Sequence, residues 1–256
     1  FRSSGKTCAM NELFGATRNV VKERYALLTP SGFVPSNLPG WSNVVANVLI
    51  SPGMGADFSQ LLIAFNKEGR GHGHTGTTEY FVFVLNGNCG SVIGGKKQKL
   101  LAGSYAFIPP GEDFIFHEAS VGARLLIFQK KYQPQDGLEI PDALVSHQKN
   151  VKGEPFLGNA DARLQVLLPD NPRFDMAVNI FTYEPGATLP FVETHIMEHG
   201  LVMLSGQGVY RLDADYHPVQ TGDVIWMAPY CPQWFVAMGK TPASYIYYKD
   251  VNRAPI

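Results

Sequence analysis

Residues 193–208 of the 256-residue chain have the sequence ETHIMEHGLVMLSGQG, which combines potential metal ligands with the pattern of a strand and a turn. Glu193, His195 and His199 fall on alternate positions, so on an extended strand their side chains leave the same face. Gly206 follows at a point where a hairpin with a positive φ angle is expected. The stretch therefore predicts a strand that carries three potential ligands into a barrel and then turns back.

A fourth potential ligand, Gln233, follows a second glycine-marked turn. One carboxylate, two imidazoles and one amide oxygen can converge on a divalent cation, and this set lacks thiolates. A mixed nitrogen and oxygen set suits octahedral Mn²⁺ or Fe²⁺ at least as well as tetrahedral Zn²⁺. A lone histidine on an apolar strand is more often a hydrogen-bonded core residue, but the spacing of the whole set favours an open metal site and catalysis.

Short apolar runs rich in Val, Ile, Phe and Tyr recur along the chain, with Gly, Pro and Asn between them. This pattern is typical of antiparallel sandwiches and barrels, so the expected class is all-β. Weak helical periodicity appears only at residues 142–147. The expected strands are residues 45–50, 60–65, 80–85, 104–108, 124–128, 176–183, 201–204, 224–227 and 244–248.

The chain also repeats itself, because a shift of 119 residues places Gly87 on Gly206 and Gly103 on Gly222. A shared register of glycines indicates shared hairpin geometry. We therefore expect two tandem antiparallel β-barrels of the jelly-roll type, an N-terminal one at 1–135 and a C-terminal one at 136–256, joined through a polar linker at about 132–155. The same shift places Lys130 on Lys249.

The first repeat keeps the glycine frame without the ligands. The positions equivalent to the four potential ligands hold His74, Gly76, Tyr80 and Phe114. His72 and His74 form an H-x-H pair, yet the glycine-rich surroundings and Phe114 argue against a complete site. We expect a first barrel without metal that packs against the second.

Composition limits the partners. The formal net charge is -1, and 45% of residues are hydrophobic against 17% charged. Lys and Arg residues are scattered, so no nucleic-acid footprint is present. No stretch of 18 uncharged apolar residues exists, so no membrane span is expected. The predicted partner is a small molecule, and antiparallel barrels with open edges also favour a homo-oligomer.

The second repeat resembles the cupin superfamily, whose two short motifs carry metal ligands on a double-barrel or single-barrel scaffold. Glu193, His195, His199 and Gln233 fall on its four ligand positions, although a histidine stands at the usually acidic third and a glutamine at the usually histidine fourth. Gly222 keeps its place, while Ala228 and Tyr230 replace a Pro and a Gly. The resemblance implies a bicupin that keeps metal binding with an altered ligand order.

A narrower resemblance is to the (S)-ureidoglycine aminohydrolases. It rests on residues 25–30 (YALLTP), 193–200 (ETHIMEHG), 204–210 (LSGQGVY) and 244–250 (SYIYYKD), and it runs through both barrels. That family releases ammonia from (S)-ureidoglycine to give (S)-ureidoglycolate in purine and allantoin catabolism, using Mn²⁺. Its plant members, which this chain resembles more than the bacterial ones, reside in the endoplasmic reticulum.

Carried over position by position, the resemblance implies a metal site and a substrate site that overlap. The metal ligands would be Glu193, His195, His199 and Gln233. The substrate-binding residues would be Glu193, Gln233, Tyr245, Lys249 and Tyr210, with Lys249 and Glu193 also catalytic. Two alternatives stay open at this stage: another metal-dependent cupin enzyme, such as an isomerase or dioxygenase, and a non-catalytic bicupin of the seed-storage kind.

Overall fold

The computed structural model describes residues 17–253, and these contain no α-helix. Every strand pair in that range is antiparallel. The all-β prediction is confirmed. The strands in chain order are β1 (Val20–Val21), β2 (Tyr25–Leu28), β3 (Pro35–Ser36), β4 (Trp41–Ile50), β5 (Ser59–His74), β6 (Thr78–Asn86), β7 (Asn88–Ile93), β8 (Lys96–Leu101), β9 (Ser104–Ile108), β10 (Asp113–His117), β11 (Arg124–Lys131), β12 (Leu144–His147), β13 (Glu154–Phe156), β14 (Asn159–Val166), β15 (Met176–Tyr183), β16 (His199–Ser205), β17 (Gln207–Leu212), β18 (Asp215–Gln220), β19 (Val224–Met227), β20 (Gln233–Met238) and β21 (Ala243–Asp250).

All nine expected strands lie within observed ones, in β4, β5, β6, β9, β11, β15, β16, β19 and β21. The weak helical periodicity at residues 142–147 was misleading, because Leu144–His147 is the strand β12. This segment pairs along β9, and the tertiary pairing overrides a local pattern of only six residues.

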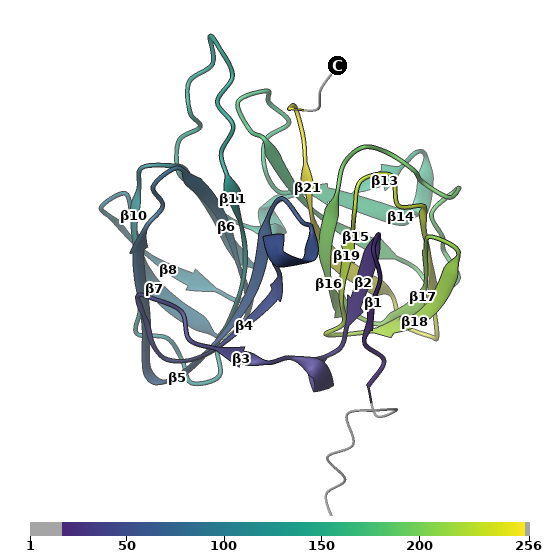
Figure 1. Ribbon diagram of the computed structural model, residues 1–256, viewed down its shortest axis with the longest axis horizontal. Helices are drawn as coiled ribbons and strands as arrows, with labels where there is room; N and C mark the ends of the chain where they lie inside the picture. Colours follow the sequence, from purple (N-terminus) through teal and green to yellow (C-terminus); the bar gives the residue numbers. More distant parts are fainter. Residues whose placement is uncertain (1–16, 254–256) are drawn as a thin grey trace, which may run out of the picture.

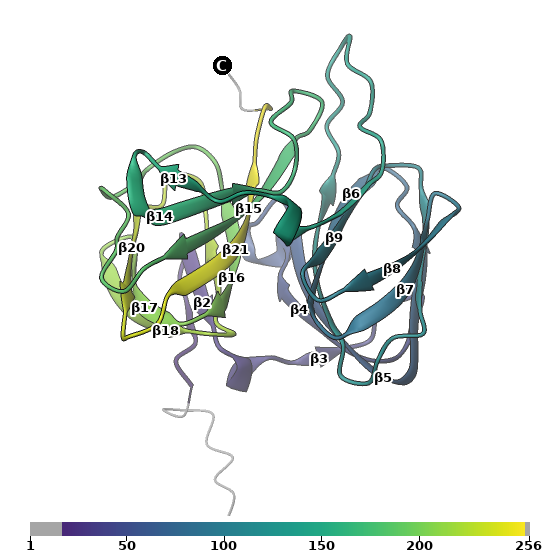
Figure 2. The same cartoon turned by 180° about the vertical axis from the view of Figure 1, so that it is seen from behind.

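The strands curl into two bodies that lie side by side (Figure 1). In the first, a ten-stranded sheet runs from β12 through β9, β6, β11, β5, β10 and β7 to β8, with β3 and β4 joined to it. In the second, an eight-stranded sheet faces the three-stranded sheet β18-β17-β20, which Figure 2 shows from behind. The two-barrel architecture expected from the sequence is therefore confirmed.

The two barrels exchange strands across the division expected at residue 135. The N-terminal strands β1 and β2 join the second barrel, where β2 pairs with β19. In return, β12 comes from beyond residue 135 and extends the sheet of the first barrel beside β9. Figure 1 shows the strands β1 and β2 on the second barrel. Each barrel is therefore completed by the other half of the chain.

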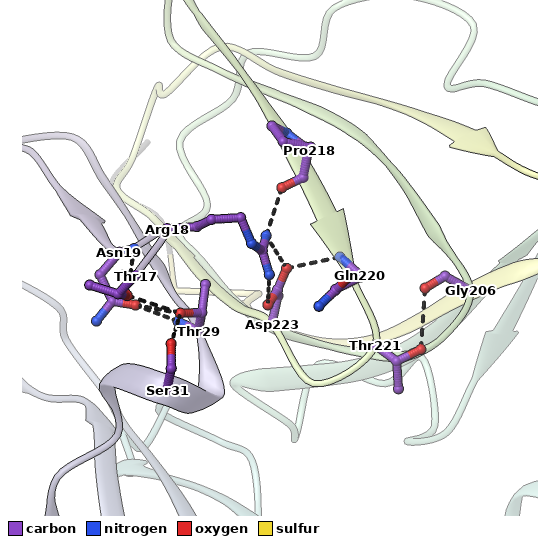
Figure 3. A network of polar contacts seen from close by, with 10 residues as sticks. All are labelled: Thr17, Arg18, Asn19, Thr29, Ser31, Gly206, Pro218, Gln220, Thr221 and Asp223. Atoms are coloured by element: carbon purple, nitrogen blue, oxygen red, sulfur yellow. Dashed lines mark hydrogen bonds and ion pairs between the residues drawn. The ribbon is translucent and has the colours of Figure 1, made fainter. Parts of the chain in front are cut away.

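An ion pair fixes the N-terminal segment on the second barrel (Figure 3). The guanidinium of Arg18 donates two hydrogen bonds to the buried carboxylate of Asp223, at 2.7 and 2.8 Å, and a third to the carbonyl of Pro218. Asp223 also accepts the backbone N–H of Gln220 at 2.8 Å. This bidentate geometry is among the stronger forms of ion pair.

Each barrel has its own hydrophobic core, and a third core lies between them. Along β6, Val82 points into the first barrel whereas Phe83 points into the core between the barrels. Along β16, Leu201 and Val202 divide in the same way. Because successive residues of a strand face opposite sides, one strand contributes side chains both to the core of its own barrel and to the core between the barrels. A large apolar interface of this kind holds the barrels as a unit.

The repeated glycines occupy equivalent turns, as the sequence predicts. Gly87 and Gly206 have φ angles of 74° and 73°, and Gly103 and Gly222 have 87° and 91°. All four are in the left-handed region, where a side chain is disfavoured. The shift of 119 residues is therefore correct for the strands between these turns.

Candidate active site

The predicted site residues converge on one cavity of about 150 Å³ inside the second barrel. A larger cavity of about 470 Å³ lies between the barrels, but its lining is mostly apolar and includes none of the predicted residues. The smaller cavity is lined by Phe156, Leu164, Phe181, Glu193, His195, Met197, His199, Leu201, Tyr210, Met227, Gln233, Tyr245, Tyr247 and Lys249. All seven residues that the sequence assigned to the site are among them.

The two histidines face each other through their Nε2 atoms, which lie 3.2 Å apart. In His199, Nδ1 donates to the carbonyl oxygen of Tyr248 at 3.1 Å, and in His195 it donates to that of Met197 at 3.2 Å. With both Nδ1 atoms acting as donors, each Nε2 carries a lone pair. Backbone carbonyls that fix a histidine tautomer in this way are typical of metal-binding imidazoles.

Burial keeps these imidazoles neutral. It lowers the pKa of His199 to about 3, with the neighbouring His195 adding to the effect. Burial also lowers the pKa of His195. Two neutral nitrogens whose lone pairs face each other repel, and a cation between them removes that repulsion. The pair fits a metal ion better than it fits a hydrogen bond.

Gln233 and Glu193 complete the cluster from adjacent backbone. Each residue donates its N–H to the other's carbonyl, at 2.8 and 2.9 Å. The amide Nε2 of Gln233 donates to His195 Nε2 at 3.0 Å, while its Oε1 accepts the hydroxyl of Tyr210 at 3.3 Å. Ligation through the amide oxygen thus requires the amide to turn by 180°, a rotation that preserves its shape.

The cluster is not built from His, Cys, Asp and Glu side chains alone. Within residues 17–253, no group of three or more His, Cys, Asp and Glu side chains is arranged to hold a metal ion. The cluster instead combines two histidines with an amide, and Glu193 lines the same cavity. Burial raises the pKa of Glu193, and the ammonium of Lys249 acts in the opposite direction.

The predicted continuous strand through residues 193–199 is wrong. Glu193 makes only an isolated β-bridge, residues 194–198 are irregular, and β16 begins at His199. His195 is positioned instead by its carbonyl, which accepts the N–H of Tyr230 at 2.7 Å. The ligands converge because the chain bends around the cavity, so the spacing located the site through a different geometry.

The predicted tyrosines form a wall of hydroxyl groups. Tyr210 and Tyr245 both line the cavity and are buried, and the Tyr245 hydroxyl lies 3.1 Å from that of Tyr183. Burial raises the pKa of all three phenols, so they are neutral donors at physiological pH. Sequence reasoning did not single out Tyr183, which contacts Tyr245 from β15 and does not itself line the cavity.

Lys249 lies in the cavity, but the sequence paired it with the wrong residue of the first barrel. On β21, Lys249 stands opposite His199, whereas on β11 it is Gln129 that stands opposite Tyr80. Tyr80 and His199 are equivalent by their distance to the hairpin glycines. The counterpart of Lys249 is therefore Gln129, and the predicted match with Lys130 is off by one residue.

A shift of one position along the strand reverses the face on which a lysine side chain lies, because neighbouring strand positions point to opposite sides. Lys130 lies outside the first cavity, is buried, and pairs with the carboxylate of Asp175 at 2.9 Å. Gln129 lines the first cavity, as Lys249 lines the second. Lysine is thus found at this inward position in the second barrel alone.

The first barrel has a cavity of about 360 Å³ without the ligand set. Here Gly73 pairs with Phe114, as Glu193 pairs with Gln233, so Gly73 and not His74 is the counterpart of Glu193. A Cβ at Gly73 would lie 2.8 Å from the ring of Phe114, which shows that this ring covers the position. The side chain of His74 is exposed.

Comparison with known proteins decides the family. The cupin domain family matches residues 179–248. The chain is 38% identical over 252 residues to the probable (S)-ureidoglycine aminohydrolase of Oryza sativa subsp. japonica, covering 96% of this chain and 79% of the rice protein. It is 36% identical over 244 residues to the (S)-ureidoglycine aminohydrolase of Escherichia coli (strain K12), covering 93% of each.

The chain belongs to the (S)-ureidoglycine aminohydrolase family. The crystal structure of protein Ylba from E. coli has the same fold, with a TM-score of 0.85 and 33% identity over 94% of this chain and 97% of that one. Membership of this family makes the chain an enzyme of the hydrolase class. The non-catalytic bicupin alternative is thereby set aside.

Proposed function

We propose that this aminohydrolase-family enzyme releases ammonia from (S)-ureidoglycine to give (S)-ureidoglycolate, with Mn²⁺ as its metal. The observation that supports a metal-dependent reaction is the pair of histidine Nε2 atoms, 3.2 Å apart, whose lone pairs face each other at the wall of the cavity. The reaction breaks one C–N bond, forms one C–O bond with water, and expels ammonia.

The side chains fit a divalent cation. His195 and His199 would hold it through Nε2, Gln233 through Oε1 and Glu193 through its carboxylate. Nitrogen and oxygen donors without thiolate suit Mn²⁺ or Fe²⁺. A metal ion bound there would polarise and orient oxygen atoms of the substrate.

The remaining side chains would bind and orient the substrate. Lys249, half-buried at the edge of the cavity, supplies an ammonium for the substrate carboxylate. Tyr210 and Tyr245 supply neutral hydroxyl donors, and the carboxylate of Glu193, where the metal holds it only loosely, would contact the departing amine. Fixing a small molecule at several points lowers the entropic cost of reaching the reacting geometry.

The proposed partner is a small-molecule ureide. No helix within residues 17–253 has the length and apolarity needed to span a bilayer. Homo-oligomerisation stays a prediction. So does residence in the endoplasmic reticulum, which rests on the resemblance to plant members.

The decisive experiment gives the purified metal-free protein freshly generated (S)-ureidoglycine with and without Mn²⁺. Ammonia release above the spontaneous rate should require the metal. A protein that accelerates nothing under either condition would contradict the proposal. Measuring dioxygen consumption in the same reaction separates a hydrolase from a cupin dioxygenase, which would consume dioxygen.

A further inference from the structure

The inward face of β15 and β21 carries a polar pair that the first barrel lacks. Asn179 and Tyr247 stand directly opposite each other in the second barrel. In the first barrel the same register places Leu61 opposite Ile127. The two pairs are equivalent, because Tyr247 also pairs with Leu201 on β16 and Ile127 also pairs with Val82 on β6. Leu201 and Val82 are themselves related by the shift of 119 residues. A polar pair thus replaces an apolar one only in the barrel that holds the ligand cluster.

The pair is buried and has a defined hydrogen-bond direction. Asn179 is 2% exposed and Tyr247 is 9% exposed. The amide Nδ2 of Asn179 donates to the hydroxyl oxygen of Tyr247 at 3.1 Å. A hydroxyl that accepts through its oxygen keeps its own proton for another acceptor. Within residues 17–253 no such acceptor is bonded to it, and Tyr247 lines the cavity.

The ring of Tyr247 is held from two sides. It stacks on Phe181 with ring centroids 5.7 Å apart and an interplanar angle of 10°. It also meets His199 edge-on, at 5.4 Å and 87°. These contacts fix the ring, so the amide of Asn179 decides where the hydroxyl proton points.

We propose that Tyr247 donates a hydrogen bond to the ureido carbonyl oxygen of the substrate, and that Asn179 is the positioning residue that directs this proton. The inference rests on the proposed function. Lys249 lies two residues along the same face, roughly 6.5 to 7 Å away along the strand. The ammonium and the phenol can therefore contact the two ends of one small molecule, its carboxylate and its ureido group.

Four variants test this: Tyr247→Phe, Asn179→Leu, the double variant, and Tyr248→Phe as the matched control. Tyr248 is the next residue on β21, faces the core between the barrels, and has a buried hydroxyl without a hydrogen-bond partner among the described residues. Asn179→Leu introduces the residue found in the first barrel. If it does not fold, Asn179→Ala takes its place.

The readouts are KM, kcat and the dissociation constant of (S)-ureidoglycolate measured by calorimetry. Tyr247→Phe should raise KM and the product dissociation constant about tenfold, the size expected for one hydrogen bond, with kcat much less affected. Asn179→Leu should do the same, and the double variant should be no worse than Tyr247→Phe alone. Tyr248→Phe should match the wild type.

Two results would overturn the inference: an unchanged Tyr247→Phe, or additive losses in the double variant, since additivity means that Asn179 does not act through Tyr247. Failure of the proposed function looks different. In that case the wild type itself neither releases ammonia nor binds (S)-ureidoglycolate.

Discussion

His195 Nε2 and His199 Nε2 lie 3.2 Å apart, and each imidazole donates its Nδ1 proton to a backbone carbonyl. Both lone pairs are therefore fixed toward the same point. The relationship predicts that the two histidines bind one ion together and that neither binds it well alone.

His199→Leu should weaken Mn²⁺ binding by more than about 100-fold, because changes to the outer partners of a ligand alone cost about 10- to 100-fold. Titration of the metal-free protein with Mn²⁺, followed by the spectroscopic signal of the free ion, measures this. His72→Ala together with His74→Ala is the control, since this H-x-H pair has exposed side chains in the first barrel. If the control lost the ion and His199→Leu kept it, the metal would be bound in the first barrel, which contradicts the prediction.

Lys249→Met should abolish ammonia release while Mn²⁺ stays bound, because it removes the ammonium from the cavity without touching the histidines. Initial rates and the metal content of the same preparation provide the check. Gln129→Met, at the matching inward position of the first barrel, should leave the rate unchanged. Turnover of Lys249→Met within a factor of about 3 of the wild type would show that the lysine has no essential role.

Lys130→Met should instead destabilise the fold. Lys130 donates to the side chain and the backbone carbonyl of Asp175, at 2.9 and 3.1 Å, and both side chains are buried. Removing one partner leaves a buried charge, which costs about 3 to 5 kcal/mol of unfolding free energy. Denaturant unfolding measures the change, with Lys131→Met, the exposed neighbour, as control. Equal stability of the two variants would mean that Asp175 is compensated elsewhere.

These two lysines show what sequence comparison could and could not predict. Runs of branched and aromatic residues identified nine strands, and the glycines identified the equivalent turns. The stretch from Gln233 to Lys249 is one residue longer than its counterpart from Phe114 to Gln129, and an ungapped comparison cannot detect this. Lys130 and Lys249 therefore looked equivalent, although one residue of register reverses the face of a strand.

The site was predicted by residue type more successfully than by conformation. Glu193, His195, His199 and Gln233 were identified by spacing, yet the strand inferred from that spacing does not exist. Asn179 and Tyr183 escaped notice because polar groups on a buried strand give no signal until the strand register is known. The residues that line the cavity could be predicted from local sequence, whereas contacts between distant strands needed the fold.

A buried acid between the barrels gives the protein a predictable response to pH. Glu79 is fully buried, and neither of its carboxyl oxygens, nor Oδ1 of Asp175, has an N–H or O–H donor among the described residues. Burial raises the pKa of Glu79 well above its ordinary value of 4.5. The hydrogen bond and charge of Asp175 add to this, against Lys130 and Arg253. A proton on Glu79 turns two facing acceptors into a donor and an acceptor.

A carboxyl whose pKa is raised by folding stabilises the protein fully below its unfolded pKa, and this stability is lost as pH rises through the folded value. As the pH rises above about 5, the melting temperature of the wild type should therefore fall more steeply than that of Glu79→Gln, whose amide is neutral at every pH. Glu184→Gln, an exposed position, should keep the wild-type slope. If Glu79→Gln instead lowers the melting temperature equally at every pH, the carboxyl is ionised in the folded protein and Lys130 balances its charge.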